Sequence, residues 1–263
     1  MDGSEIVFQG SCLRAIGTAL DRPRTLVTFD HRERGKADFP AYRCVNRALN
    51  HGMGHLSIST AANDWFLNPE TEMLRAALRR FATDRTVRAI GFSMGGYGAM
   101  LFAGDLRLER MVLVAPQYSI FPEHWPHDPR YAPYAVPLDA RLDRIPPAEG
   151  EGPAGLVLYD PRLQPFDRKH AAGVCRHFPR LRPVALPFGG HPPLQNFERG
   201  VGSARILGAL LTDRLTPALV RGFHREVRVT SERYQRRLSK YLAARAARGA
   251  DGTPPPPVRR PAA

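Results

Sequence analysis

The sequence predicts an α/β fold in which a mostly parallel central sheet is flanked by helices. The chain has 263 residues, 43% of them hydrophobic, which is enough for one large domain with a full core. Short apolar runs alternate with segments of helical spacing, and near-continuous apolar runs are typical of parallel strands buried on both faces. One such run, 87–90, leads into a glycine-rich turn at 91–99. Together these observations predict one α/β domain over residues 1–215.

Individual strands and helices follow from where these runs lie. A leading hairpin is expected because two short strand-like runs stand close together at the N-terminus. The runs with strand character are 5–8, 13–16, 25–29, 55–59, 87–90, 110–115, 154–159 and 181–188. The segments with helix signals are 42–49, 69–78, the residues after Ser93, a helix beginning at Asp167, 197–211 and a helix within 216–249.

The glycine-rich turn carries a serine. Gly91-Phe92-Ser93-Met94-Gly95 is a G-x-S-x-G motif between a buried strand and a helix. A nucleophile elbow needs this order, because the serine sits on a strained turn and the glycines allow close approach of the neighbouring backbone. The alternative is a glycine-rich turn with an incidental serine.

The residues from Ser93 to Ala99 resemble a known family. Ser-Met-Gly-Gly-Tyr-Gly-Ala is similar to the elbows of esterase-D-like acyl hydrolases and acyltransferases in the α/β-hydrolase superfamily. The close match covers about ten residues. A looser match in the order of elements extends from about Thr25 to about Leu211. The resemblance implies an α/β-hydrolase fold with a serine nucleophile and leaves the substrate open.

Two further residue types are needed for such chemistry. A serine hydroxyl is a weak nucleophile at neutral pH, so an imidazole must take its proton and a carboxylate must orient the imidazole. His191 follows the last strand, and Asp160 follows the strand 154–159, which gives the chain order Ser, Asp, His. We expect Asp160 to be the acid. Asp167, which also fits a helix N-cap, is the alternative.

Acyl transfer also requires hydrogen-bond donors for the oxyanion. The backbone N–H of Met94 is expected to be one donor. The second is expected from the loop after Phe29, at His31 or a neighbour, although this loop lacks the His-Gly-Gly of the family. An ordinary loop histidine is the other interpretation of His31.

A long proline- and aromatic-rich segment, 116–153, follows the strand 110–115. Long loops are usually functional, and its position predicts a cap or lid insertion over the serine. Trp125, Tyr131 and Tyr134 are then candidate substrate-binding residues. The alternative is that these aromatic side chains only pin the loop. Trp65, near the end of the strand 55–59, is a further candidate for the pocket, with core packing as the alternative.

Charge and cysteine usage narrow the function classes. The formal net charge is +13, yet nearly all basic residues are arginine and they are spread along the chain apart from a concentration in the C-terminal segment, which argues against nucleic-acid binding. Three cysteines without C-x-x-C spacing fit reduced thiols, and nothing indicates a metal or a cofactor. A membrane span and a secretory signal are not expected, which predicts a cytoplasmic protein.

The C-terminal region differs from the rest. Residues 216–249 predict a basic helix that packs on its own domain or binds a protein partner, and 250–263 predict a disordered, proline-rich tail. The sequence as a whole predicts a serine-dependent acyl hydrolase acting on a small or glycan-linked acyl ester. An acyltransferase with the same triad, or a non-catalytic interaction module of the same fold, is the alternative.

Overall fold

The protein is described by a computed structural model that covers residues 3–147, 150–197 and 200–250. A single sheet of eight strands runs through it in the order β1-β2-β4-β3-β5-β6-β7-β8. The strands β1 and β2 form the expected hairpin, β2 pairs antiparallel with β4, and all other pairs are parallel. The strand bounds are β1 Ser4–Gln9, β2 Leu13–Thr18, β3 Arg24–Phe29, β4 Gly54–Thr60, β5 Thr86–Phe92, β6 Leu108–Val114, β7 Ala154–Tyr159 and β8 Leu181–Ala185. The predicted α/β fold with a mostly parallel sheet is confirmed.

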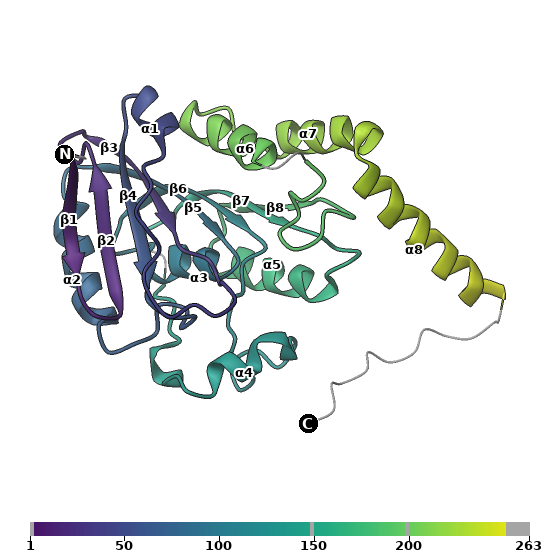
Figure 1. Cartoon of the computed structure of the whole chain (residues 1–263), viewed down its shortest axis with the longest axis horizontal. Helices are drawn as coiled ribbons and strands as arrows, with labels where there is room; N and C mark the ends of the chain where they lie inside the picture. Colours follow the sequence, from purple (N-terminus) through teal and green to yellow (C-terminus); the bar gives the residue numbers. More distant parts are fainter. Residues whose placement is uncertain (1–2, 148–149, 198–199, 251–263) are drawn as a thin grey trace.

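Helices cover both faces of the sheet (Figure 1). Their bounds are α1 Asn46–Asn50, α2 Thr71–Phe81, α3 Met94–Leu101, α4 Ala132–Ala135, α5 Pro165–His177, α6 Val201–Leu211, α7 Pro217–Thr230 and α8 Glu232–Ala250. Side chains alternate between the two faces of a strand, so a buried parallel strand contributes to two cores. In β6, Met111 and Leu113 pack in the core with α2, α3 and α5, whereas Val112 and Val114 pack in the core with α6 and α7.

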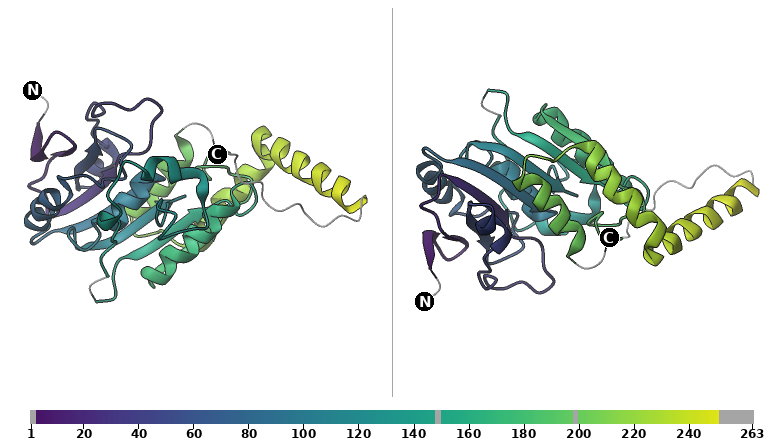
Figure 2. Two further views of the ribbon diagram at one scale, coloured as in Figure 1. Left: turned by 90° about the horizontal axis from the view of Figure 1, so that it is seen from below. Right: turned by 90° about the horizontal axis from the view of Figure 1, so that it is seen from above.

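The C-terminal region holds two helices where the sequence predicted one. The break lies at Ser231, whose backbone is extended (φ −82°, ψ 106°) between α7 and α8. The β-branched residues Val229 and Thr230 weaken the helix before this point, and the Ser231 side chain accepts a hydrogen bond from the N–H of Tyr234 (3.3 Å), which caps α8. The helix α8 extends away from the body of the protein (Figures 1 and 2). The predicted tail falls outside the described residues, apart from Ala250.

Smaller differences concern the ends of elements. The first helix is shorter than expected, and the last strand ends at Ala185, so the chain is already irregular as it approaches His191. The segment 116–153 contains the 3-10 helices η1 (Pro129–Tyr131) and η2 (Ala140–Leu142) as well as α4. Its function as a lid stays a prediction.

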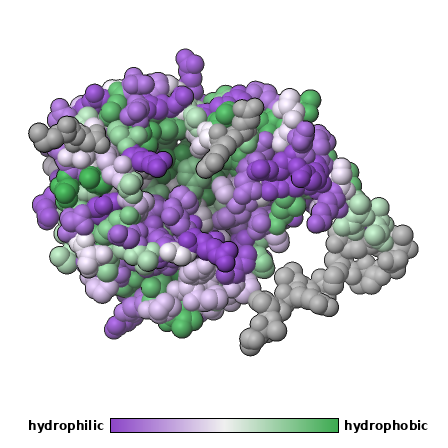
Figure 3. All heavy atoms as spheres, viewed as in Figure 1, coloured by the Kyte–Doolittle hydropathy of each residue, from purple (hydrophilic) through white to green (hydrophobic). Residues whose placement is uncertain are grey.

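Two surface properties bear on partners. Figure 3 shows hydrophilic side chains gathered where α7 meets α8, and exposed arginines of this region include Arg221, Arg225, Arg228 and Arg236. Within the described part of the chain, no helix combines the length and the hydropathy that crossing a bilayer requires. A protein partner of the basic helices stays a prediction.

Candidate active site

Ser93 lies on a strained turn between β5 and α3. Its backbone has φ 51° and ψ −118°, a conformation that costs a non-glycine residue energy. Glycine is required at positions 91 and 95 because a side chain there would collide with neighbouring backbone atoms. A Cβ on Gly91 would lie 2.2 Å from the carbonyl oxygen of Gly95, and a Cβ on Gly95 would lie 2.6 Å from the carbonyl oxygen of Asp30. The G-x-S-x-G pattern therefore lifts the serine hydroxyl out of the sheet at the carboxyl end of β5.

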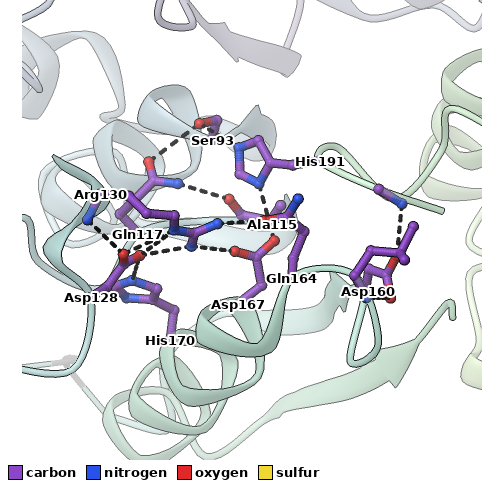
Figure 4. Close-up of polar contacts among 12 residues, drawn as sticks. Ser93, Ala115, Gln117, Asp128, Arg130, Asp160, Gln164, Asp167, His170 and His191 are labelled. Atoms are coloured by element: carbon purple, nitrogen blue, oxygen red, sulfur yellow. Dashed lines mark hydrogen bonds and ion pairs between the residues drawn. The ribbon is translucent and has the colours of Figure 1, made fainter. Parts of the chain in front are cut away.

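His191 connects Ser93 to a buried carboxylate (Figure 4). The Nε2 atom of His191 lies 3.0 Å from Ser93 Oγ, and its Nδ1 atom lies 3.0 Å from Asp167 Oδ2. The Asp167 side chain is only 1% exposed and comes from the first turn of α5. With Nδ1–H donating to Asp167, the Nε2 atom is left as an acceptor for the serine proton.

Asp167, and not the expected Asp160, provides the carboxylate that contacts His191. The helix α5 begins at Pro165, after Gln164, so Asp167 is not its N-cap but points from its first turn toward the histidine. Asp160 follows β7 directly, and its Oδ1 accepts the N–H groups of Arg162 (2.8 Å) and Leu163 (3.1 Å). Proline at the first helical position was the signal that could have placed Asp167 inside the helix.

The buried carboxylate of Asp160 also reaches the histidine loop. Its Oδ2 accepts the backbone N–H of Gly190 at 2.8 Å, directly before His191. Its hydrogen bonds within the described part of the chain thus come from main-chain amides, and they hold the loop between β8 and α6 against the loop after β7.

A cation lies behind Asp167. Arg130, from the segment between β6 and β7, places Nη2 2.6 Å from Asp167 Oδ1 and 2.7 Å from Asp128 Oδ2. Its Nη1 donates to Gln164 Oε1 at 2.6 Å. Burial opposes the charge of Arg130, but the two carboxylates outweigh it and raise the pKa of the guanidinium above its ordinary value. Both oxygens of Asp167 are therefore used, one by the imidazole and one by Arg130.

Asp128 completes this network with a second histidine. His170 Nδ1 accepts the N–H of Tyr118 (2.9 Å), so its Nε2 carries the proton and donates to Asp128 Oδ2 (2.9 Å). Burial disfavours the ionised form of Asp128, but hydrogen bonds from His170 and Arg130 outweigh that cost and hold its pKa well below the usual range. Burial lowers the pKa of His170, so this imidazole is neutral. These residues were not among the predicted site residues, since nothing local in the sequence marks contacts between such distant segments.

Gln117 and Tyr131, both from the segment 116–153, contact Ser93 and His191. Gln117 Oε1 accepts from Ser93 Oγ and from Trp65 Nε1, both at 3.3 Å. The hydroxyl of Tyr131 lies 3.4 Å from His191 Nε2. Burial raises the pKa of Tyr131, so the phenol stays protonated. The hydroxyl hydrogen of Ser93 thus has two acceptors, of which the imidazole is the closer.

A cavity of about 340 Å³ opens beside Ser93. It is lined by His31, Arg32, Phe92, Ser93, Tyr131, His191 and Pro192. A larger hollow of about 990 Å³ lies between α2 and residues 140–147, but it is lined by other residues and is remote from the serine. The smaller cavity is the one that could hold a substrate of Ser93.

The other expected pocket residues fall in different places. Tyr131 lines the cavity, whereas Trp65 is fully buried and packs against Tyr131 and Tyr134. Tyr134 accepts a hydrogen bond from Arg32 Nη1 at 3.0 Å, so it supports the cavity wall through that arginine. Trp125 lies elsewhere and stacks on His170, with its ring centroid 5.6 Å away.

The two expected oxyanion donors are not equivalent. Met94 is the first residue of α3, so its N–H has no acceptor within the helix and is free to bind an anion. The N–H of His31 donates to the carboxylate of its neighbour Asp30 (2.8 Å). His31 lines the cavity, but its amide is already engaged.

One group among the described residues has the spacing of a metal site. Asp30, His31 and Glu33 bring their ligand atoms within 4.8 Å of one another. The Asp30 carboxylate is ion-paired with the buried ammonium of Lys36, which neutralises the charge that a metal would need. This arrangement is explained without an ion.

Comparison with known proteins relates the fold to solved structures. Family models and curated proteins gave no match to this sequence. The glycosylation-associated protein complex Gap123 from Streptococcus agalactiae is similar with a TM-score of 0.54 at 13% identity, over 80% of this chain and 45% of that chain. This chain thus spans less than half of that longer one.

An esterase from the fungus Rhizomucor miehei is similar with a TM-score of 0.50 at 12% identity, over 80% of this chain and 83% of the esterase. An α/β hydrolase from the metagenome of a lagoon in Morocco, MGS-MChE2, reaches 0.49 at 12% identity, over 80% of this chain and 99% of the hydrolase. At such low identities these likenesses concern the fold.

Proposed function

We propose that this chain, which has an α/β-hydrolase fold, is a serine-dependent acyl hydrolase or acyltransferase. The observation that carries the proposal is the hydrogen-bonded series of Ser93, His191 and Asp167, with both contacts at 3.0 Å, on the wall of a cavity. The strained backbone of Ser93 supports it further, because strain of this kind is kept where it positions a reacting group.

The chemistry follows from the protonation states of these groups. His191 Nε2 takes the proton of Ser93 as Oγ attacks the acyl carbon, and Asp167 stabilises the resulting imidazolium. The N–H of Met94 donates to the oxyanion. The imidazolium then returns its proton to the leaving alcohol, which leaves an acyl group on Ser93. Water or another hydroxyl, activated by His191, removes this group in the second half of the reaction.

The substrate class is proposed on weaker grounds. The cavity of about 340 Å³ fits a small acyl ester. A structural neighbour is described as part of a glycosylation-associated complex, which favours including acylated sugars among the esters to be tested. Whether water or a sugar hydroxyl is the acyl acceptor separates the hydrolase from the transferase.

A non-catalytic interaction module of the same fold is the second candidate. It is favoured by one observation: the N–H of His31, the expected second oxyanion donor, is bound to the Asp30 carboxylate. A module of this kind needs no oxyanion hole, whereas an enzyme must find its second donor elsewhere in the loop after β3.

Covalent labelling distinguishes the two. The protein should react with a fluorophosphonate probe and hydrolyse p-nitrophenyl acetate, and Ser93→Ala should abolish both, with a loss of about six decades in turnover. Ser119→Ala is the matched control, because Ser119 is buried outside the cavity and should label like the wild type. Equal labelling of the wild type and Ser93→Ala, or no labelling of either, contradicts a serine enzyme.

A further inference from the structure

The first turns of α8 pack against the loop between β8 and α6 that carries His191. Tyr234 and Tyr241 lie on one face of the helix and contact the ring of Phe188, with centroid distances of 5.6 and 5.3 Å. Tyr234 is buried, and its ring also packs against His224 of α7. The part of the chain beyond the sheet therefore touches the segment that places the catalytic base.

Arg237 extends from the same face of α8 into this loop. Its Nη1 donates to the carbonyl oxygens of Phe188 (3.1 Å) and Gly189 (2.8 Å), and its Nη2 donates to Gln195 Oε1 (2.7 Å). Gln195 Nε2 in turn donates to the carbonyl oxygen of His191 at 2.6 Å. Two side chains thus link the helix to the main chain of His191 itself.

The guanidinium of Arg237 directs its donors to neutral acceptors. Burial lowers its pKa, and in the described part of the chain its hydrogen bonds go to two carbonyls, a glutamine and Asn196. A guanidinium presents several donors in a rigid fork, so one side chain can fix several loop carbonyls at once.

The backbone of this loop is strained at Phe188, whose φ of 62° lies in the left-handed region that costs a bulky side chain energy. Gly190 has φ 83°, which a glycine adopts without strain. A Cβ on Gly190 would lie 2.8 Å from Gln195 Oε1 and 2.9 Å from Arg237 Nη2, so the arginine fits against a glycine. Asp160 holds the N–H of Gly190 from the sheet side, and Arg237 holds the preceding carbonyls from the helix side.

We propose that Arg237 is a positioning residue for His191 and that α8 is part of the support of the active site. The proposal rests on the proposed function. Removing the guanidinium frees the carbonyls of residues 188 and 189 and the side chain of Gln195, so the imidazole is less well held against Ser93. A displacement of about 1 Å in a reacting group costs up to about 100-fold in rate, while the binding of substrate to the cavity is unaffected.

The test compares Arg237→Ala, Arg237→Lys and Arg236→Ala in the full chain. Arg236 is the exposed neighbour on α8 and serves as the matched control. We expect kcat for p-nitrophenyl acetate to fall about 10- to 100-fold in Arg237→Ala with KM within about twofold, to recover in part in Arg237→Lys, and to stay unchanged in Arg236→Ala. Gln195→Ala should share part of the defect, and combining it with Arg237→Ala should cost less than the sum of the two, because the hydrogen bond between the two side chains is lost in either variant.

A second measurement separates this proposal from the proposed function. Hydrogen exchange of the peptide covering residues 188–196 should be faster in Arg237→Ala than in Arg236→Ala, whether or not the protein is an enzyme. Faster exchange together with a wild type that turns over no ester would leave the loop contact standing and overturn the function. Unchanged exchange, or an active wild type whose kcat is matched by Arg237→Ala, would overturn the role of Arg237.

Discussion

Asp160 directly follows β7 and Asp167 lies in the first turn of α5, and both are buried, yet their partners differ in kind. Among the described residues, the hydrogen bonds to Asp160 come from backbone N–H groups, two from its own turn and one from Gly190. Asp167 accepts from an imidazole and from a guanidinium. A carboxylate directly after a strand is satisfied by the turn that follows, as in other Asx turns. A carboxylate in the first turn of a helix can point at a neighbouring loop.

The two aspartates therefore act on different parts of the same histidine segment. The amides around Asp160 fix the main chain before His191, whereas Asp167 fixes the ring. We therefore expect substitutions of Asp160 to act mainly on stability and substitutions of Asp167 mainly on rate.

The largest effect is expected for Asp167→Asn. The asparagine Nδ2 would face His191 Nδ1 and force that atom to accept, so the proton would move to Nε2 and block transfer from Ser93. We expect kcat to fall about 10⁴-fold with little change in Tm. Steady-state turnover of p-nitrophenyl acetate together with thermal unfolding measures both. A larger fall in Asp160→Asn than in Asp167→Asn would return the acid role to Asp160.

The next effect concerns the cation beside Asp167. Arg130→Gln leaves Asp128 and Asp167 buried with no positive charge between them, which should lower the free energy of unfolding by about 3–5 kcal/mol. Arg141 makes the same local contacts with Asp139, but it is exposed. Arg141→Gln is therefore the matched control and should unfold like the wild type in urea. Equal stability of the two variants would show that Asp167 does not need its cation.

A smaller loss is expected for Asp160→Asn. The asparagine can still accept from the turn after β7, but its Nδ2 would oppose the N–H of Gly190 and leave that amide without an acceptor. We expect the free energy of unfolding to fall by about 1–3 kcal/mol and kcat to fall less than about tenfold. Chemical denaturation of the same samples that are used for turnover gives both values. If Asp160→Asn lowered kcat without lowering the free energy of unfolding, Asp160 would act on the reaction and not mainly on stability.

The smallest effect is a pH dependence of the free energy of unfolding, which arises from His170 in the network behind Asp167. Burial lowers the pKa of His170 in the folded protein, so the unfolded chain binds the proton first as the pH falls below about 6.5. Wild-type stability should therefore fall on acidification by at most about 1.4 kcal/mol per pH unit from this group. His170→Gln removes this contribution, so the stability difference between wild type and variant should narrow from pH 7.5 to pH 5. A constant difference would mean that folding does not shift the pKa of His170, and a difference that widens toward pH 5 would mean that folding raises it.

The fold was predictable because its signals are local. Each expected strand is found within a few residues of its predicted bounds, since apolar runs and glycine-rich turns specify strand and elbow directly. The proximity of Ser93 and His191 followed from the strand order, because residues after parallel strands gather at one edge of the sheet. The partner of His191 depended on how the chain turns between Asp160 and Asp167. The proline at position 165 marks the start of α5 and so places Asp167 inside the helix, but local sequence does not show which aspartate reaches the histidine.

The supporting residues could not be predicted for a different reason. Arg130, Gln117 and Arg237 act through contacts with segments far away in the sequence, and nothing in their own neighbourhood distinguishes them from the many other polar residues. The break at Ser231 was missed because the apolar spacing continues through it. Only the fold decides which of these side chains face the site.

Arg130 also constrains how a substrate reaches Ser93. The segment 116–153 provides the counter-ion of Asp167, so moving this segment outward would carry Arg130 and Asp128 away together and leave the buried carboxylate of Asp167 without its cation, at a cost of about 3–5 kcal/mol. Fewer than about one molecule in a hundred would then be open at any moment, since each 1.4 kcal/mol is a factor of ten. In the proposed reaction, ester and alcohol would therefore exchange with the segment 116–153 in place, through the opening bordered by His31, Arg32 and Pro192, and the width of that opening would limit which acyl esters enter.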